Sequence, residues 1–267
     1  MKLLTSANIL AALIFLVAIA YTASQMLAPD AKQANSVSTP KSVPNAKALP
    51  DFSTYQNVKA KKAAFFGYML PLVQARNTHT LAQRQQLLAL SAQADSELSA
   101  GNTSLLTELA AAYRLSDSEL SNQDLINELL MRADTVPPSL ALAQAAVESA
   151  WGTSRFAVQA NNLFGQWCYE KGCGLVPKRR NSGANHEVAK FDSVSDAVHS
   201  YMRNINTHRA YQDLRESRAE LRAEDDTITG HILAKGLLRY SERGKDYVHE
   251  LQAVIRVNKL TPYDEAS

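Results

Sequence analysis

The chain has 267 residues, of which 46% are hydrophobic and 20% are charged, so it can build a folded core and is not wholly disordered. Its 28 Lys and Arg residues nearly balance 26 Asp and Glu residues, and this formal charge of +2 gives no sign of the basic face that nucleic-acid binding needs. Two cysteines are too few for a disulfide scaffold or a four-thiolate zinc site. The length predicts one or two domains.

The N-terminal segment carries no charged side chain between Lys2 and Asp30. One basic residue followed by an apolar run is typical of a secretory signal or an N-terminal anchor. The uncharged residues 3–28 are long enough to cross a hydrocarbon core of ~30 Å, and no good signal cleavage site follows them. We therefore expect residues 1–28 to tether a periplasmic protein to the inner membrane. Secretion after signal cleavage is the alternative, and both alternatives export the rest of the chain.

Residues 29–52 form the next predicted region, a flexible linker. Four of the nine prolines lie there, among Ser, Ala, Asn and Lys. Such a composition cannot bury enough apolar surface to order itself. At ~3.1 Å per residue, its reach is on the order of 65 Å, which would let an anchored domain stand away from the membrane.

Residues 53–124 are predicted to form a helical extension with a packing role. An apolar stretch at 57–75 is interrupted by Pro71, and a helix-prone stretch follows at 80–98. Gly101-Asn102 is expected to end this helix before a stripe of leucines with helical spacing. Ser116 or Ser118 is the expected cap of a short helix that ends near Asp134.

The remainder is also mainly helical. Prolines at 137 and 138 open a helix that the Gly152 region ends. Ser193 and Asp196 form a capping-box variant before the next helix, and two more are expected at about 226–238 and 244–257. Only residues 166–191 lack a helical period, so they are predicted to form a loop or small β-lobe within a mainly α domain. Residues 259–267 are a tail.

The β-lobe contains Cys168 and Cys173. In an exported protein a disulfide is the expected state of such a pair, and its short loop implies local bracing. No nearby histidine completes a zinc site, and the six histidines show no metal-ligand spacing. We expect neither a metal nor a cofactor.

Glu148 is the one ionisable side chain between Thr135 and Ser154. Its helix is apolar on nearly every face, as in a buried core helix. Burial without a cation on the same helix disfavours the ionised form and should raise the pKa of the carboxyl. A carboxyl that stays protonated near neutral pH is what a general acid needs to protonate a glycosidic oxygen. A Glu that pairs with a distant Arg, or lies exposed at the helix end, is the alternative.

Residues 161–167, Asn-Asn-Leu-Phe-Gly-Gln-Trp, follow this helix. Aromatic rings stack on sugar faces and amides bond hydroxyl and acetamido groups, so Phe164, Gln166 and Trp167 suit a sugar site. Core packing is the alternative role for the two aromatic side chains.

Together, Leu142-Ala-Gln-Ala-Ala-Val-Glu-Ser-Ala-Trp-Gly-Thr-Ser154 and Asn161-Asn-Leu-Phe-Gly165 resemble the glucosaminidase domain of glycoside hydrolase family 73. The resemblance covers roughly 125–258 and implies a peptidoglycan hydrolase with a lysozyme-like helical lobe. It implies that Glu148 is the catalytic acid and that Asn162, Phe164, Tyr201 and Tyr240 lie in or near the glycan groove. The segment that contains Phe65-Phe-Gly-Tyr-Met-Leu-Pro-Leu-Val73 resembles the Bax proteins of Gram-negative bacteria, which carry this domain at the C-terminus.

The sequence departs from this family in the β-lobe, where members often supply a second acidic residue. The interval 166–190 holds only Glu170 and Glu187, and Glu187 is the better candidate because it adjoins the family-like Val-Ala-Lys-Phe. Without a second carboxylate, the nucleophile could be the substrate's 2-acetamido group, or an inverting attack could come from water held by Tyr240 or by a distant acid.

The function expected from these patterns is cleavage of the β-1,4 bond after N-acetylglucosamine in peptidoglycan. A non-catalytic peptidoglycan-binding scaffold and a lysozyme-like muramidase or lytic transglycosylase are the main alternatives. An amidase is disfavoured because it would usually need a metal or a Cys/His pair.

Overall fold

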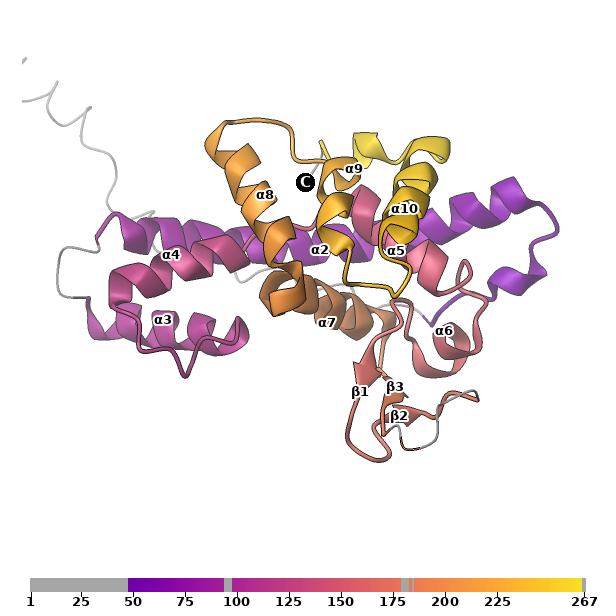
Figure 1. Ribbon diagram of the computed structural model, residues 1–267, viewed down its shortest axis with the longest axis horizontal. Coiled ribbons are helices and arrows are strands. Elements are labelled where there is room, and N and C mark those ends of the chain that lie inside the picture. Colours follow the sequence, from indigo (N-terminus) through magenta and orange to yellow (C-terminus); the bar gives the residue numbers. More distant parts are fainter. Residues whose placement is uncertain (1–47, 94–97, 179–182, 184, 266–267) are drawn as a thin grey trace, which may run out of the picture. The chain divides into compact units, whose positions relative to one another are not determined.

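The computed structural model describes residues 48–93, 98–178, 183 and 185–265 (Figure 1). The expected anchor at residues 1–28, and nearly all of the linker expected at 29–52, lie outside the described residues. Within the described ranges, no helix is both long enough and apolar enough to cross a membrane.

The described chain is mainly α-helical with one small sheet, which confirms the predicted fold class. Before the sheet the elements are η1 (Phe52–Thr54), α2 (Val58–Ser91), α3 (Ala100–Ala112), α4 (Asn122–Arg132), α5 (Pro138–Glu148) and α6 (Arg155–Ala160). The strands are β1 (Trp167–Cys168), β2 (Gly174–Leu175) and β3 (Glu187–Ala189). After the sheet come α7 (Val194–Thr207), η2 (Arg209–Tyr211), α8 (Gln212–Ala223), α9 (Gly230–Leu233), η3 (Ala234–Leu237), α10 (Lys245–Val257) and η4 (Thr261–Tyr263).

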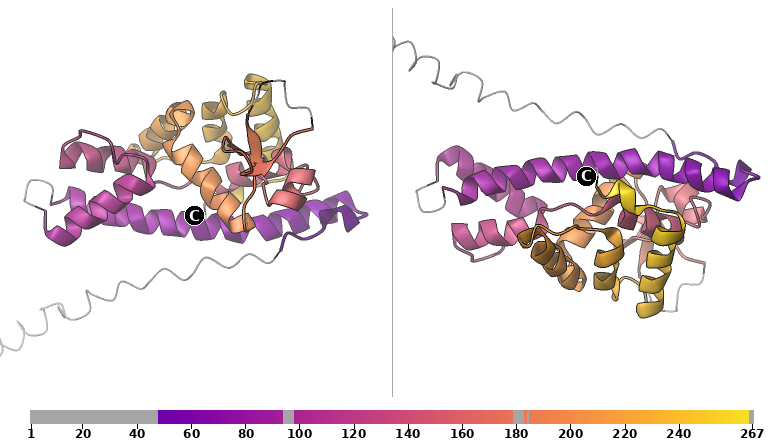
Figure 2. Two further views of the ribbon diagram at one scale, coloured as in Figure 1. Left: turned by 90° about the horizontal axis from the view of Figure 1, so that it is seen from below. Right: turned by 90° about the horizontal axis from the view of Figure 1, so that it is seen from above.

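Helix α2 runs without a break through Pro71, so the interruption predicted there is wrong (Figure 2). A proline inside a helix costs about 3 kcal/mol because it removes one backbone hydrogen bond and crowds the preceding turn. Phe65, Met69 and Val73 of the same helix are fully buried, and each such side chain contributes roughly 1.5–3 kcal/mol. Burial around Pro71 therefore outweighs its local cost.

Two other local predictions need correction. Gly101 and Asn102 lie in the first turn of α3, whose N-cap Ser99 accepts a hydrogen bond from the Asn102 amide. The cap of α4 is Ser121, which accepts from the Asp124 amide, and neither Ser116 nor Ser118 caps it. Both helices thus begin at a serine whose hydroxyl satisfies an otherwise unpaired amide.

Helix α5 occupies the centre of the larger core, and residues 138–146 of it are buried. It packs against α2 on one side and against α9 and α10 on the other (Figure 1). A second core joins the end of α2 to α3 and α4. Because Phe65 and Met69 of α2 belong to the α5 core, that core spans the boundary expected between residues 124 and 125.

The β-lobe predicted within residues 166–191 is a three-stranded antiparallel sheet in the order β1-β3-β2. Trp167 pairs with Val188, and Leu175 pairs with the same residue from the other side. The expected disulfide between Cys168 and Cys173 is present, with the two Cα atoms 6.2 Å apart. It closes the loop that joins β1 to β2, so the sheet is braced next to the end of α6.

Candidate active site

Glu148 is the last residue of α5 and is partly buried. Burial raises the pKa of its carboxyl above the usual value, a hydrogen bond from Tyr247 lowers it, and the charge of Glu250 raises it further. The net direction is upward. The C-terminal end of a helix also carries a partial negative charge, which disfavours the ionised carboxylate. Glu148 therefore has the electrostatic setting predicted for a proton donor.

The turn after Glu148 is held in an uncommon backbone conformation. Ala150, Trp151 and Gly152 have φ values of +50°, +60° and +78°, all in the left-handed region. Ser149 stabilises this turn, since its hydroxyl donates to the Ala145 carbonyl at 2.6 Å and accepts from the Gly152 amide at 2.7 Å. Strain of this kind is found at sites where a position must be fixed, and here it fixes the end of the helix that carries Glu148.

The turn at residues 161–165 is organised by Asn162, which is buried. Its side-chain amide donates to the carbonyls of Gln166 at 2.9 Å and Ala189 at 2.8 Å, and its oxygen accepts from the Gln166 amide at 3.1 Å. All of these partners are backbone groups, so the role of Asn162 visible here is to shape the turn and tie it to β3. Direct contact with a glycan remains a prediction.

Gly165 brings this turn against the catalytic candidate. Its φ is +66°, and a Cβ added there would lie 3.1 Å from Oε2 of Glu148. Glycine is the residue that adopts this conformation without strain and leaves room for the carboxyl. The glycine of the Asn-Leu-Phe-Gly sequence therefore lets the turn approach Glu148 closely.

A chain of buried polar groups reaches Glu148 from α7 through α5 and α10. The Tyr201 hydroxyl donates to Oε1 of Gln144 at 2.7 Å, and Nε2 of Gln144 donates to the Tyr247 hydroxyl at 3.1 Å. Tyr247 in turn hydrogen-bonds to Glu148. Gln144 and Tyr247 were not among the predicted site residues. Gln144 lies four residues before Glu148 on the same helix face, which is the signal that could have found it.

Two stacked aromatic pairs support the same region. Phe164 stacks on Tyr201 with ring centroids 4.0 Å apart, and Tyr240 stacks on Tyr247 at 5.6 Å. The Tyr240 hydroxyl donates to the Phe164 carbonyl at 2.7 Å. Phe164 and Tyr201 are almost fully buried, so their rings act as packing under the site. A glycan contact from either ring stays a prediction.

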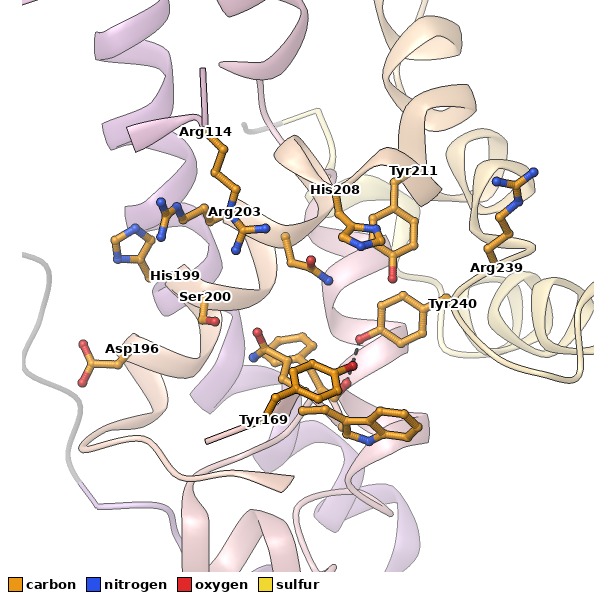
Figure 3. A pocket seen from close by; sticks show the side chains of 15 residues that line it. Arg114, Tyr169, Asp196, His199, Ser200, Arg203, His208, Tyr211, Arg239 and Tyr240 are labelled. Carbon is orange, nitrogen blue, oxygen red and sulfur yellow. Dashed lines mark hydrogen bonds between the residues drawn. The ribbon is translucent and has the colours of Figure 1, made fainter. Parts of the chain in front are cut away.

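A cavity of about 680 Å³ opens beside this cluster, between the β-lobe, α7 and the segment around Tyr240 (Figure 3). Gly165, Gln166 and Trp167 line it, and Glu148 lies behind Gly165 outside the lining. Trp167 is 56% exposed and Tyr169, also in the lining, is 73% exposed. Exposed rings of this kind offer flat faces on which a sugar can stack.

Glu187, the predicted second carboxylate, is buried in β3. Its two oxygens accept hydrogen bonds from the amides of Gly172 at 3.0 Å and Gly174 at 2.9 Å. These contacts hold the disulfide loop. A catalytic role for Glu187 remains a prediction. Glu187 and the sulfurs of Cys168 and Cys173 lie close enough to share an ion, but the sulfurs are bonded to each other and offer no thiolate.

Residues 126–260 match the glucosaminidase family, described as mannosyl-glycoprotein endo-beta-N-acetylglucosaminidase. The chain therefore belongs to the glucosaminidase family, a class of glycosidases with glycan substrates. It is also 34% identical over 212 residues to "Protein bax" of Escherichia coli (strain K12), a match that covers 79% of this chain and 75% of that protein. This agrees with the Bax-type organisation that the sequence suggests. No solved structure matches the chain.

Proposed function

We propose that the protein hydrolyses peptidoglycan at the β-1,4 bond after N-acetylglucosamine, with Glu148 as the general acid. The observation that carries the proposal is the position of Glu148 at the end of a buried apolar helix, where burial raises the pKa of its carboxyl and its Oε2 lies close to Gly165, which lines a cavity. Family membership supports a glycosidase, and the exposed rings in the cavity support a sugar ligand.

In the proposed reaction Glu148 gives its proton to the glycosidic oxygen of the leaving sugar. A raised pKa keeps part of the carboxyl population protonated at neutral pH, as general acid catalysis requires. Tyr247 orients the carboxyl through its hydrogen bond and supports the carboxylate after the proton has left. Gln144 fixes the Tyr247 hydroxyl in turn.

The second catalytic group is a separate question. Glu187 stays the proposed candidate, although the two amides that it accepts from give it a bracing role as well. The variant Glu187→Gln separates these roles. A loss of kcat with an unchanged melting temperature supports catalysis by Glu187. A lower melting temperature with kcat retained assigns it to bracing and leaves the acetamido group or a water beside Tyr240 as the attacking group.

The location of the protein is also a proposal. The uncharged segment at 3–28 supports export to the periplasm with an inner-membrane tether, and the proline-rich stretch after it supports a spacer. Cell fractionation tests this directly. Recovery of the intact chain in the membrane fraction supports an anchor, recovery of a shortened chain in the soluble periplasm supports cleavage, and recovery in the cytoplasm contradicts both.

The mass spectrum of the products released from purified peptidoglycan tests the reaction. Fragments with N-acetylglucosamine at the reducing end are expected. Reducing-end muramic acid would assign a muramidase, and an anhydro-muramic end would assign a lytic transglycosylase. Tight binding to peptidoglycan without a soluble product at any pH would make the protein a binding module and contradict the proposed activity.

A further inference from the structure

The cavity beside Glu148 has a second, cationic side. Arg114, from the turn after α3, and Arg203, on the exposed face of α7, both line it, as do His199 and His208 (Figure 3). Asp196 is the one carboxylate in the lining, and its Oδ2 accepts from the Ser193 hydroxyl at 2.7 Å. The cavity thus has one aromatic side that suits a sugar ligand and one side that carries guanidinium groups.

These arginines lack carboxylate partners in the described part of the chain. Arg203 donates through Nε to the Ala112 carbonyl at 2.9 Å, which leaves the rest of its guanidinium for other contacts. Nε of Arg76 is buried without a hydrogen-bond partner, and the charge of Arg76 acts on His199. None of these three arginines, Arg76, Arg114 and Arg203, is in an ion pair among the described residues, whereas the three arginines around Asp134 all share its carboxylate.

The positive charges also act on one another. Partial burial lowers the pKa of Arg114, and the nearby charge of Arg203 lowers it further. Burial, followed by the charges of Arg76 and Arg203, lowers the pKa of His199 to about 4, so this side chain is neutral at pH 7. Unpaired like charges in a partly desolvated cavity destabilise the empty protein, and an anionic ligand relieves that repulsion. Arg presents a planar fork that binds a carboxylate through two parallel hydrogen bonds.

The substrate already proposed contains such an anion. The sugars of a peptide-bearing strand are neutral, because the lactyl carboxyl of each muramic acid is in amide linkage to a short peptide, and that peptide carries free carboxylates. We propose that Arg114 and Arg203 bind a carboxylate of this stem peptide, so that the enzyme prefers strands with ionised stem peptides over strands whose peptide carboxylates are neutralised. This inference rests on the proposed function, because it places the glycan on the aromatic side of the same cavity.

The test compares kcat/KM of the full-length protein on un-cross-linked strands and on the same strands after their peptide carboxylates have been converted to neutral amides. Removal of the peptides by an amidase would instead leave a free lactyl carboxylate on every muramic acid. The wild type should prefer the strands with free peptide carboxylates by at least about tenfold, as expected for a charged pair in a partly desolvated cavity. Arg203→Gln and Arg114→Gln should bring this ratio toward one. Arg203→Gln removes the hydrogen bond to the Ala112 carbonyl, and this loss could disturb folding. Arg114 is exposed, so Arg114→Gln should fold normally and keeps the test valid.

Arg256→Gln is the matched control, because it removes the same charge from an exposed position of α10 outside the cavity. It should leave the substrate ratio unchanged. Equal cleavage of both strands by the wild type, or a ratio unchanged in both cavity variants, overturns the inference while the proposed function stands. Cleavage of neither strand contradicts the proposed function instead. Calorimetric binding of the two strands to Glu148→Gln then decides the inference, which fails when both bind equally.

Discussion

Tyr247→Phe removes one hydroxyl from beside the proposed acid and leaves the ring stack with Tyr240 in place. That hydroxyl lowers the pKa of Glu148, so its loss must raise the pKa further. A hydrogen bond to a charged group contributes about 1.5–3 kcal/mol, and 1.36 kcal/mol corresponds to one pKa unit. The pKa of Glu148 should therefore rise in the variant.

The pH dependence of kcat/KM measures this change. Because a general acid is active when protonated, the alkaline limb of the profile reports its ionisation. That limb should move to higher pH by roughly 1–2 units in Tyr247→Phe. The variant should also lose about 1–3 kcal/mol of stability, since Nε2 of Gln144 loses its buried acceptor.

A control separates the two effects. Tyr113 lies in the second core, whereas Tyr247 belongs to the core around α5, and the Tyr113 hydroxyl donates to Gln83 at 2.8 Å, so Tyr113→Phe loses a comparable tyrosine bond in the other core. It should lower stability and leave the pH profile unchanged. An alkaline limb that stays in place in Tyr247→Phe, or moves to lower pH, would refute the electrostatic account of Glu148.

Three further variants test the fold around the site. Asp134→Ala leaves three arginines without their shared carboxylate and should cost about 3–5 kcal/mol in urea unfolding, with activity unchanged at temperatures where the variant stays folded. Burial raises the pKa of Asp134, but the arginines outweigh burial and the net pKa is lowered. The stabilisation from these ion pairs is therefore present at neutral pH and is lost as pH falls through the lowered pKa. An Asp134→Ala variant as stable as the wild type at neutral pH would contradict the pairing. Gly165→Ala should lower stability by about 1–2 kcal/mol because of the left-handed backbone at this position. It should also reduce the kcat of the folded variant, because the added Cβ would lie 3.1 Å from Oε2 of Glu148. A wild-type kcat would contradict the close approach. Replacing Cys168 and Cys173 by serine should cost roughly 2 kcal/mol at most and increase proteolysis within the β-lobe, whereas unchanged proteolysis would argue against bracing.

Much of the architecture follows from local patterns in the sequence. The apolar run around Glu148 predicts its buried helix, and the Ser193–Asp196 pair predicts the start of α7, where the Ser193 hydroxyl accepts from the Asp196 amide. The loss of helical period after residue 165 predicts the β-lobe. These features depend on residues close together in the chain, so a periodicity or a cap is enough to find them.

The errors arise where distant residues decide the local structure. Pro71 favours a break, but the core that α2 shares with α5 keeps the helix continuous. Ser116 and Ser121 each have a carboxylate three residues later, Glu119 and Asp124, so local chemistry alone does not choose between them as the cap of α4. The hydrogen bond from Tyr247 to Glu148 joins side chains nearly a hundred residues apart, and no spacing rule predicts it. The same holds for the meeting of Arg114 with Arg203 in one cavity.

The central claim is that Glu148 supplies the catalytic proton, and the release of reducing ends from peptidoglycan by Glu148→Gln tests it most directly. The amide has nearly the same shape but cannot donate the acid proton, so kcat should fall about 10²–10⁴-fold. Stability at pH 7 should be retained or increased. A carboxyl whose pKa is raised by folding destabilises the folded protein as pH rises above the pKa of that carboxyl in the unfolded chain. Glu250→Gln, which removes a neighbouring exposed carboxylate on α10, should keep most of the activity. Release of reducing ends by folded Glu148→Gln at the wild-type rate would contradict the account.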